Sequence, residues 1–137
     1  MRAAALAVAL LAAGHAPTAA GAACGDDLGV AGVRRIERPA HVLAYRPEPA
    51  TVEPGALFAL RVAVCGRGAP APDLVRVDAW MPEHGHGMNY GPVVTAERDG
   101  RWRVDGLMFH MPGRWEIRFD VGTRQRTERL AAEETVE

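Results

Sequence analysis

Short runs of alternating apolar and polar residues, separated by proline, glycine and aspartate, constrain the fold of this chain most strongly. The clearest run spans residues 114–121, where every second residue is apolar. A period of two is typical of a strand that turns one face to the core and the other to water. No sustained period of 3.6 residues follows residue 23. The sequence therefore predicts an all-β domain of the sandwich type.

About seven strands are expected from these runs. Their predicted ranges are 40–46, 57–65, 74–81, 93–98, 101–107, 114–121 and 124–130. Asp99-Gly100 separates the fourth strand from the fifth, and this dipeptide favours a type I′ hairpin turn because both central residues need a positive φ. Met81 ends an alternating run, so we expect its side chain in the core.

The first residues have the order of a secretory signal. Arg2 precedes an unbroken apolar run at 3–13, and small residues continue to Ala23. This run is shorter than the about 20 residues that a membrane-spanning helix needs. Small residues at the required spacing permit cleavage after Ala20, Ala22 or Ala23, and the sequence alone does not choose among them. The mature protein is expected in the periplasm or outside the cell, without a transmembrane segment.

The expected organisation is one domain of ordinary size. Residues 1–23 are assigned to the signal peptide, 24–39 to an N-terminal arm, 40–131 to the β-sandwich and 132–137 to a frayed tail.

The chain has two cysteines, Cys24 and Cys65. In an oxidising compartment an even pair favours a disulfide, which would connect the arm to a core strand. The alternative is a lipid anchor on Cys24. Gly21 occupies the position where a lipidation signal carries leucine or a similar apolar residue, which makes this alternative weaker.

Two absences narrow the function. The chain contains no serine and no lysine, which excludes a serine nucleophile, a Schiff-base lysine and a phosphate-binding loop lysine. Its formal net charge of −1 gives no indication of a nucleic-acid partner. No residue pattern identifies a reaction, and we therefore predict that the protein is not an enzyme.

Histidine and methionine are unevenly distributed. Seven of the eight such residues that follow the signal lie in two segments, MPEHGHGMNYGP and GLMFHMPGRW. If the strand at 74–81 runs to one end of the sandwich, the Asp99-Gly100 turn lies at the opposite end, and the strand at 101–107 returns to the first. The two segments should therefore be neighbours. The candidate metal ligands are His84, His86, Met88, Met108, His110 and Met111.

Imidazole and thioether together suit copper, because soft sulfur selects Cu(I) and imidazole binds either oxidation state. Thioether is not among the usual zinc ligands. Two other interpretations remain open. In the first, Met111 merely fills a gap in a turn, and the imidazoles donate hydrogen bonds to nearby carbonyl groups. In the second, Trp80 and Tyr90 form a metal-free surface for a protein partner, since aromatic residues are enriched at interfaces.

The same two segments resemble the YtkA-like family of small exported bacterial proteins, which is similar in outline to FixH-type domains linked to copper-dependent oxidase assembly. The resemblance covers about 80 residues, from Ala40 to Val121. It implies an immunoglobulin-like sandwich outside the cytoplasm. Periplasmic copper chaperones of the PCuAC type are a looser resemblance, because their His-x-Met motif differs from the order Met108, Phe109, His110, Met111 here. The resulting hypothesis is a protein that holds or delivers copper for an envelope cuproenzyme or its assembly factors.

Overall fold

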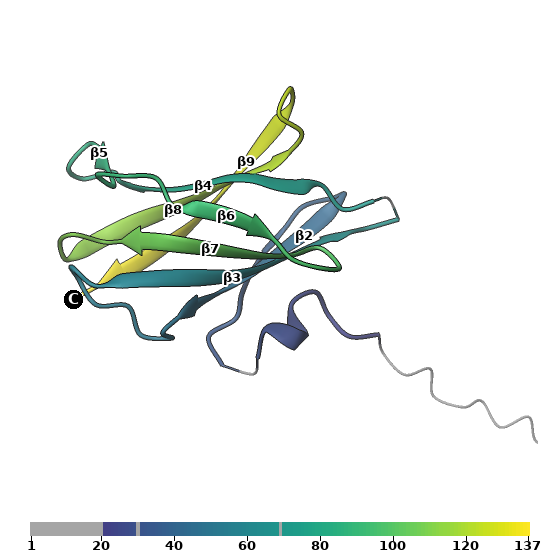
Figure 1. Cartoon of the computed structure of the whole chain (residues 1–137), viewed down its shortest axis with the longest axis horizontal. Coiled ribbons are helices and arrows are strands. Elements are labelled where there is room, and N and C mark those ends of the chain that lie inside the picture. Colours follow the sequence, from purple (N-terminus) through teal and green to yellow (C-terminus); the bar gives the residue numbers. More distant parts are fainter. Residues whose placement is uncertain (1–20, 30, 69) are drawn as a thin grey trace, which may run out of the picture.

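The computed structural model describes residues 21–29, 31–68 and 70–137, and these form a β-sandwich of two antiparallel sheets (Figure 1). Sheet A has the order β1-β2-β3-β7-β6, formed by β1 (Arg34–Glu37), β2 (His41–Glu48), β3 (Leu57–Gly66), β7 (Arg101–Met108) and β6 (Val93–Ala96). Sheet B has the order β5-β4-β8-β9, formed by β5 (His86–Gly87), β4 (Asp73–Met81), β8 (Gly113–Gly122) and β9 (Thr127–Val136). The all-β sandwich predicted from the sequence is confirmed.

The strand count differs from the expectation of about seven. Two short strands, β1 and β5, were not predicted: β1 lies within the expected N-terminal arm, and β5 lies within the loop that follows β4. Each adds an edge to a sheet, β1 beside β2 and β5 beside the end of β4. Strands of four and two residues are too short to produce a period that the sequence could reveal.

The core consists of apolar side chains from the facing surfaces of both sheets. Its largest members are Trp115, Tyr45, Phe109 and Phe119, and none of them is more than 1% exposed. The alternation predicted for 114–121 is observed, because half-buried and buried residues alternate along β8 from Arg114 to Val121. Met81 is 1% exposed, so its predicted place in the core is also confirmed.

The hairpin between β6 and β7 has the predicted turn at its tip. Asp99 and Gly100 both have positive φ angles, 57° and 69°, and the N–H of Arg101 donates to the carbonyl of Arg98 at 3.1 Å. A side chain at position 100 would also approach the carbonyl oxygen of Val64 to 2.6 Å. Gly100 is therefore required twice, for its backbone angle and for its close contact with β3.

The expectation of a frayed tail at 132–137 was wrong. Strand β9 continues to Val136, which pairs with Gly113 and is 6% exposed. The acidic Glu133-Glu134 pair concealed this strand, because acidic side chains at the end of a chain suggest solvation. Glu134 instead faces the core side, where its carboxylate accepts a hydrogen bond from the Tyr45 hydroxyl at 2.8 Å. The last strand thus connects sheet B to sheet A.

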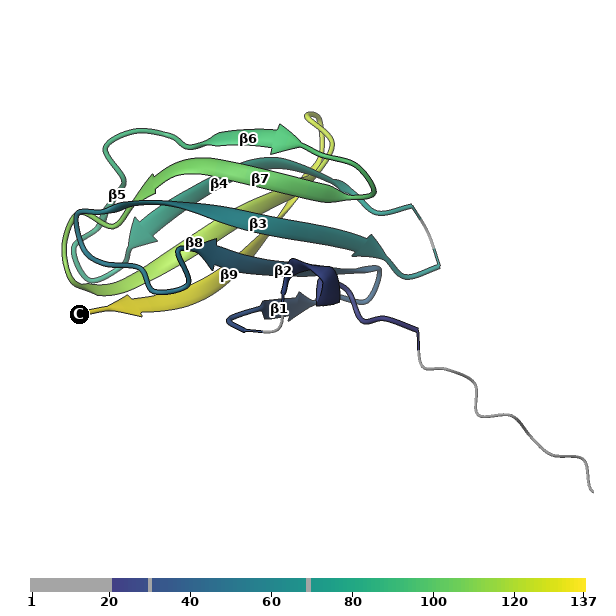
Figure 2. The ribbon, with the colours of Figure 1, turned by 60° about the horizontal axis from the view of Figure 1, so that its bottom comes forward.

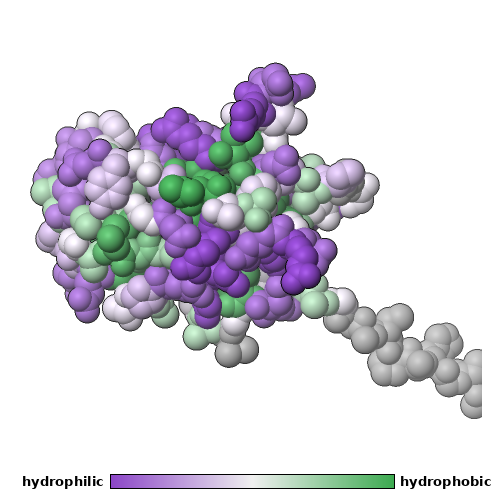
Figure 3. Space-filling view, viewed as in Figure 1, coloured by the Kyte–Doolittle hydropathy of each residue, from purple (hydrophilic) through white to green (hydrophobic). Residues whose placement is uncertain are grey.

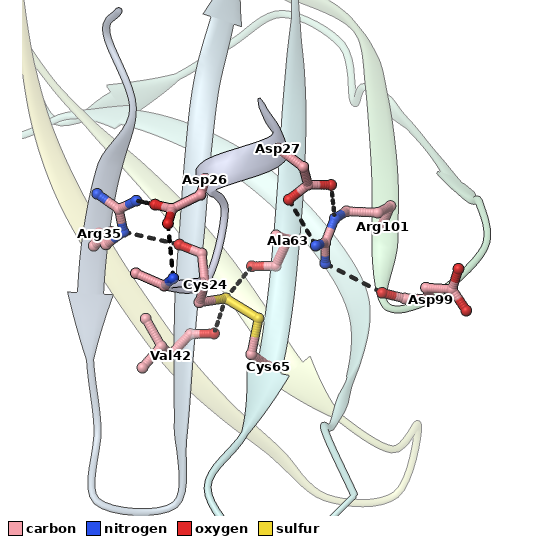
Figure 4. The surroundings of a disulfide bond; sticks show 10 residues. Cys24, Asp26, Asp27, Arg35, Val42, Ala63, Cys65, Asp99 and Arg101 are labelled. Atoms are coloured by element: carbon pink, nitrogen blue, oxygen red, sulfur yellow. Dashed lines mark hydrogen bonds and ion pairs between the residues drawn. A yellow bond between two sulfur atoms is a disulfide. The ribbon is translucent and has the colours of Figure 1, made fainter. Parts of the chain in front are cut away.

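The N-terminal arm packs on the outer face of sheet A and contains a short 3-10 helix, η1 (Asp26–Leu28). The predicted bridge between Cys24 and Cys65 is present and connects the arm to β3 (Figure 4). A second connection comes from Asp27, whose carboxylate accepts two hydrogen bonds of 2.7 Å from Arg101. This ion pair lowers the pKa of Asp27. The disulfide occupies the Cys24 sulfur that a lipid anchor would need.

No helix in the described part of the chain is long and apolar enough to cross a membrane. Residues 1–20 of the predicted signal lie outside the described residues, so the signal itself stays a prediction.

Candidate functional site

The two histidine and methionine segments meet at one end of the sandwich, as the topology predicted. Strands β4 and β7 both end at this pole, which also carries β5, whereas the Asp99-Gly100 turn lies at the opposite end (Figures 1 and 2). We call this end the His/Met pole and define it by His84, His86, Met88, His110 and Met111. In the space-filling view, this end of the molecule carries hydrophobic atoms among hydrophilic ones (Figure 3).

Three imidazoles form a chain of contacts at the pole. The rings of His86 and His110 are stacked, with centroids 5.0 Å apart and an interplanar angle of 29°. His84 meets His86 edge to face, with centroids 5.7 Å apart. His86 and His110 are half-buried and His84 is exposed. Side chains from the two different segments are therefore in direct contact.

Buried aromatic rings form a floor under the stacked pair. His86 and His110 both pack edge to face on Trp115, at centroid distances of 5.9 and 5.2 Å. Trp115 in turn stacks on Phe109 at 5.1 Å, and both rings are 0% exposed. The indole N–H of Trp115 donates to the carbonyl of Met111 at 3.0 Å. The core thus fixes the inner side of the imidazole pair.

Strand pairing explains why His86 faces the interior. His86 lies opposite Met81 in the β4–β5 register, and paired residues share a face of the sheet. The turn before it needs Gly85, which has a φ of 67°. A Cβ atom at Gly87 would lie 3.1 Å from the carbonyl oxygen of Ala79, tighter than ordinary packing. The two glycines of the segment therefore let β5 lie close against β4.

The methionines separate into two environments. Met88 and Met111 are half-buried and pack against the core, and the backbone N–H of Met88 donates to Ala79 at 3.2 Å. Met108 lies between Leu107 and Phe109, which are both 0% exposed, so its side chain leaves β7 on the outer face. There the Tyr90 hydroxyl is 3.6 Å from its sulfur. Met108 is thus beside the pole without sharing the inward face.

A bulge in β7 accounts for the position of Met108. Gly106 has a φ of 86°, and the register with β3 shifts between Phe58 and Leu60. The extra residue reverses the alternation, so that Leu107 instead of Met108 faces the core. Met108 and His110 both follow this bulge, but β7 ends at Met108, so the chain that leads to His110 is no longer a strand. His110 stacks on His86.

The imidazoles have few competing partners. His86 Nδ1 lies 3.2 Å from the carbonyl oxygen of Gly87, and no ion pair of the described residues includes His84, His86 or His110. The nearest ion pair in the same loop joins Glu83 to Arg114 at 3.5 Å. Nitrogen and sulfur donors at the pole are therefore not used by the electrostatic network of the sheets.

Within residues 21–29, 31–68 and 70–137, no three His, Cys, Asp or Glu side chains are arranged to hold a metal ion. Met88 and Met111 follow β5 and β7 at this pole, and both pack against the core cluster that contains Trp115.

The two aromatic residues considered for a partner surface lie on different elements, Trp80 on β4 of sheet B and Tyr90 in the loop between β5 and β6. Trp80 pairs with Glu116 on the outer face of sheet B, and the Arg118 guanidinium covers its ring at 5.1 Å. Tyr90 is 48% exposed and contacts Met108 at the end of β7 in sheet A. Tyr90 is the more accessible of the two rings.

Sequence reasoning did not identify two features of the described residues. The sequence placed Trp115 on the core face of its strand and gave no role to Phe109, although Trp115 contacts both imidazoles and Phe109 stacks on Trp115. His41, far from the His/Met pole in sequence, is 6% exposed, and its Nε2 lies 3.7 Å from Glu128 without a hydrogen-bond partner. Its place at the start of β2 gave no sequence signal for either burial or contact.

Comparison with models of known protein families, with curated proteins and with solved structures found no match for this chain. The resemblance to the YtkA-like family therefore stays a prediction.

Proposed function

We propose that this protein is an exported copper-binding protein that holds Cu(I) at the His/Met pole and delivers it during assembly of an envelope cuproenzyme. The observation that carries the proposal is the stacked pair His86 and His110, contributed by two separate segments and supported by the buried ring of Trp115. Two half-buried methionines pack at the same end.

The donor chemistry favours Cu(I). Neutral imidazole and thioether bind soft metal ions without losing a proton, and thioether is a poor ligand for the harder divalent ions. The Cys24–Cys65 disulfide suits an oxidising compartment, where a thiolate site would be at risk of oxidation. Imidazole and thioether donors are not lost to disulfide formation in such a compartment.

Each residue has an expected role. His86 and His110 would supply nitrogen, and Met88 and Met111 would supply sulfur. His84 is exposed at the tip of the same loop and is placed to meet arriving or leaving copper. Met108 lies on the outer face and would join only after the loop moves.

A competition titration with a chromophoric Cu(I) chelator tests the proposal. The mature protein is expected to withdraw Cu(I) from the chelator, and the variant His86→Ala/His110→Ala should lose at least tenfold in affinity. Glu83→Gln is the matched control, because this carboxylate lies in the same loop but is a hard donor. Equal affinities for the wild type and the double variant would refute a copper site at this pole.

The alternative is a metal-free interaction module at the same end of the sandwich. One observation favours it: Tyr90 and Val93, which flank the start of β6, are 48% and 65% exposed. Binding of an envelope partner that persists with a copper chelator present, and that Tyr90→Ala abolishes while His86→Ala/His110→Ala does not, would support this alternative over copper binding.

A further inference from the structure

The residues around Ala23 form a site suited to a free chain terminus. The backbone nitrogen of Ala23 lies 2.7 Å from Asp26 Oδ2, and the carbonyl oxygen of Ala23 accepts from the N–H of Asp26 at 3.1 Å. The same carboxylate receives a hydrogen bond of 2.7 Å from Arg35 through its other oxygen. Arg35 also donates to the carbonyl of Cys24 at 2.8 Å. Ala23 is thus the first described residue whose backbone N–H and carbonyl group are both held by this cluster.

The two described residues that precede Ala23, Gly21 and Ala22, have no comparable contacts. Gly21 and Ala22 are exposed and lie outside any helix or strand, and a side chain added at Gly21 would meet nothing within 4 Å. Contacts that hold the chain therefore begin between Ala22 and Ala23.

We propose that the exported chain is cleaved after Ala22, so that the mature protein begins at Ala23 and its α-ammonium group pairs with Asp26. Export itself is the expectation stated from the sequence, and the inference is independent of copper binding. Cleavage breaks the Ala22–Ala23 peptide bond by addition of water, which leaves a carboxylate on Ala22 and an amine on Ala23. The amine is protonated near neutral pH.

Each competing position fits the structure less well. Cleavage after Ala23 would remove the residue whose N–H and carbonyl group both bond to Asp26, and it would open the start of η1. Cleavage after Ala20 would leave two exposed residues ahead of the cluster. The new terminal ammonium group would then have no acidic partner in the cluster. Cleavage after Ala22 places small residues, Ala20 and Ala22, at the two positions that the processing enzyme reads.

Two single substitutions distinguish the three positions, because a bulky residue is tolerated only between the two recognised positions. The full chain is expressed with its own leader in a bacterial host, and the exported product is analysed by intact mass and N-terminal sequencing. Ala22→Leu should block cleavage at the native position, and Gly21→Leu should leave it unchanged. Cleavage after Ala23 would give the reverse pattern, and cleavage after Ala20 would survive both changes.

The expected wild-type product begins Ala-Cys-Gly-Asp. A product that begins at Gly21 or Cys24, or that keeps the leader, would overturn the proposal. A second measurement addresses the ion pair: acetylation of the mature N-terminus should lower the melting temperature, and this shift should disappear in Asp26→Asn. An equal shift in both proteins would show that Asp26 does not bind the terminal ammonium group.

Discussion

Removal of the Cys24–Cys65 bridge should destabilise the protein by about 4 kcal/mol. The cysteines are 41 positions apart in sequence, and closing a loop of this length removes about 13 cal/mol/K of entropy from the unfolded chain in the chain-entropy model, or about 4 kcal/mol at 25 °C. The native arm keeps a second attachment through Asp27 and Arg101, so the folded state should survive the change. The loss therefore arises mainly in the unfolded state.

Equilibrium urea unfolding of the wild type and of Cys24→Ala/Cys65→Ala measures this difference. Reduced wild-type protein is the matched control, since it keeps both sulfur atoms and lacks only the covalent bond. We expect the reduced protein and the double variant to agree within about 1 kcal/mol, because Cys24 packs only against the small cluster of Leu28, Ala44 and Ala63. A loss of less than about 1 kcal/mol in both would refute the reasoning from loop closure.

Three further predictions follow from the packing. Gly113→Ala should destabilise the fold by about 1 to 3 kcal/mol in thermal unfolding, because a Cβ atom there meets the methyl end of Met81 and the φ of 128° disfavours a side chain. Measured against Met81→Ala, the same substitution should cost less, because the methyl group that it meets is absent. Deletion of the last two residues should cost about 1 to 2 kcal/mol in urea unfolding through the lost burial of Val136, and an unchanged midpoint would contradict its place in the core. Burial, followed by the charge of Glu134, raises the pKa of Tyr45, so stability should fall as the pH rises above about 10, where only the unfolded chain ionises freely; Tyr45→Phe should weaken this dependence.

Much of the fold could be predicted from local patterns. The alternation at 114–121 determines which face of β8 is buried, and Asp99-Gly100 determines where β6 turns into β7. Together these two features also predict that the histidine segments meet, because they fix the direction in which each strand runs. When each turn is recognised, the sequence therefore also predicts which distant segments meet at one end of the sandwich.

The errors arose where one residue changed the period or where charge concealed a strand. Gly106 inserts a bulge that turns Met108 away from the core, and a lone glycine in a strand pattern does not show which residues it reverses. Glu134 is accommodated at the edge of the core by Tyr45 and Arg34, and neither partner is near it in sequence. These two partners of Glu134 can be identified only when the arrangement of both sheets is known.

Under the proposed function, the position of the imidazole pair between core and solvent matters as much as its chemistry. A carrier must bind Cu(I) and then release it to a partner, and release requires that ligands exchange one at a time. The buried Trp115 ring fixes one side of His86 and His110, while exposed His84 lies on the adjoining loop, whose turn depends on Gly85. Restricting that loop with Gly85→Ala should therefore slow copper transfer to a chelator more than it weakens equilibrium binding. Equal effects on rate and affinity would show that the loop contributes a ligand and does not control release.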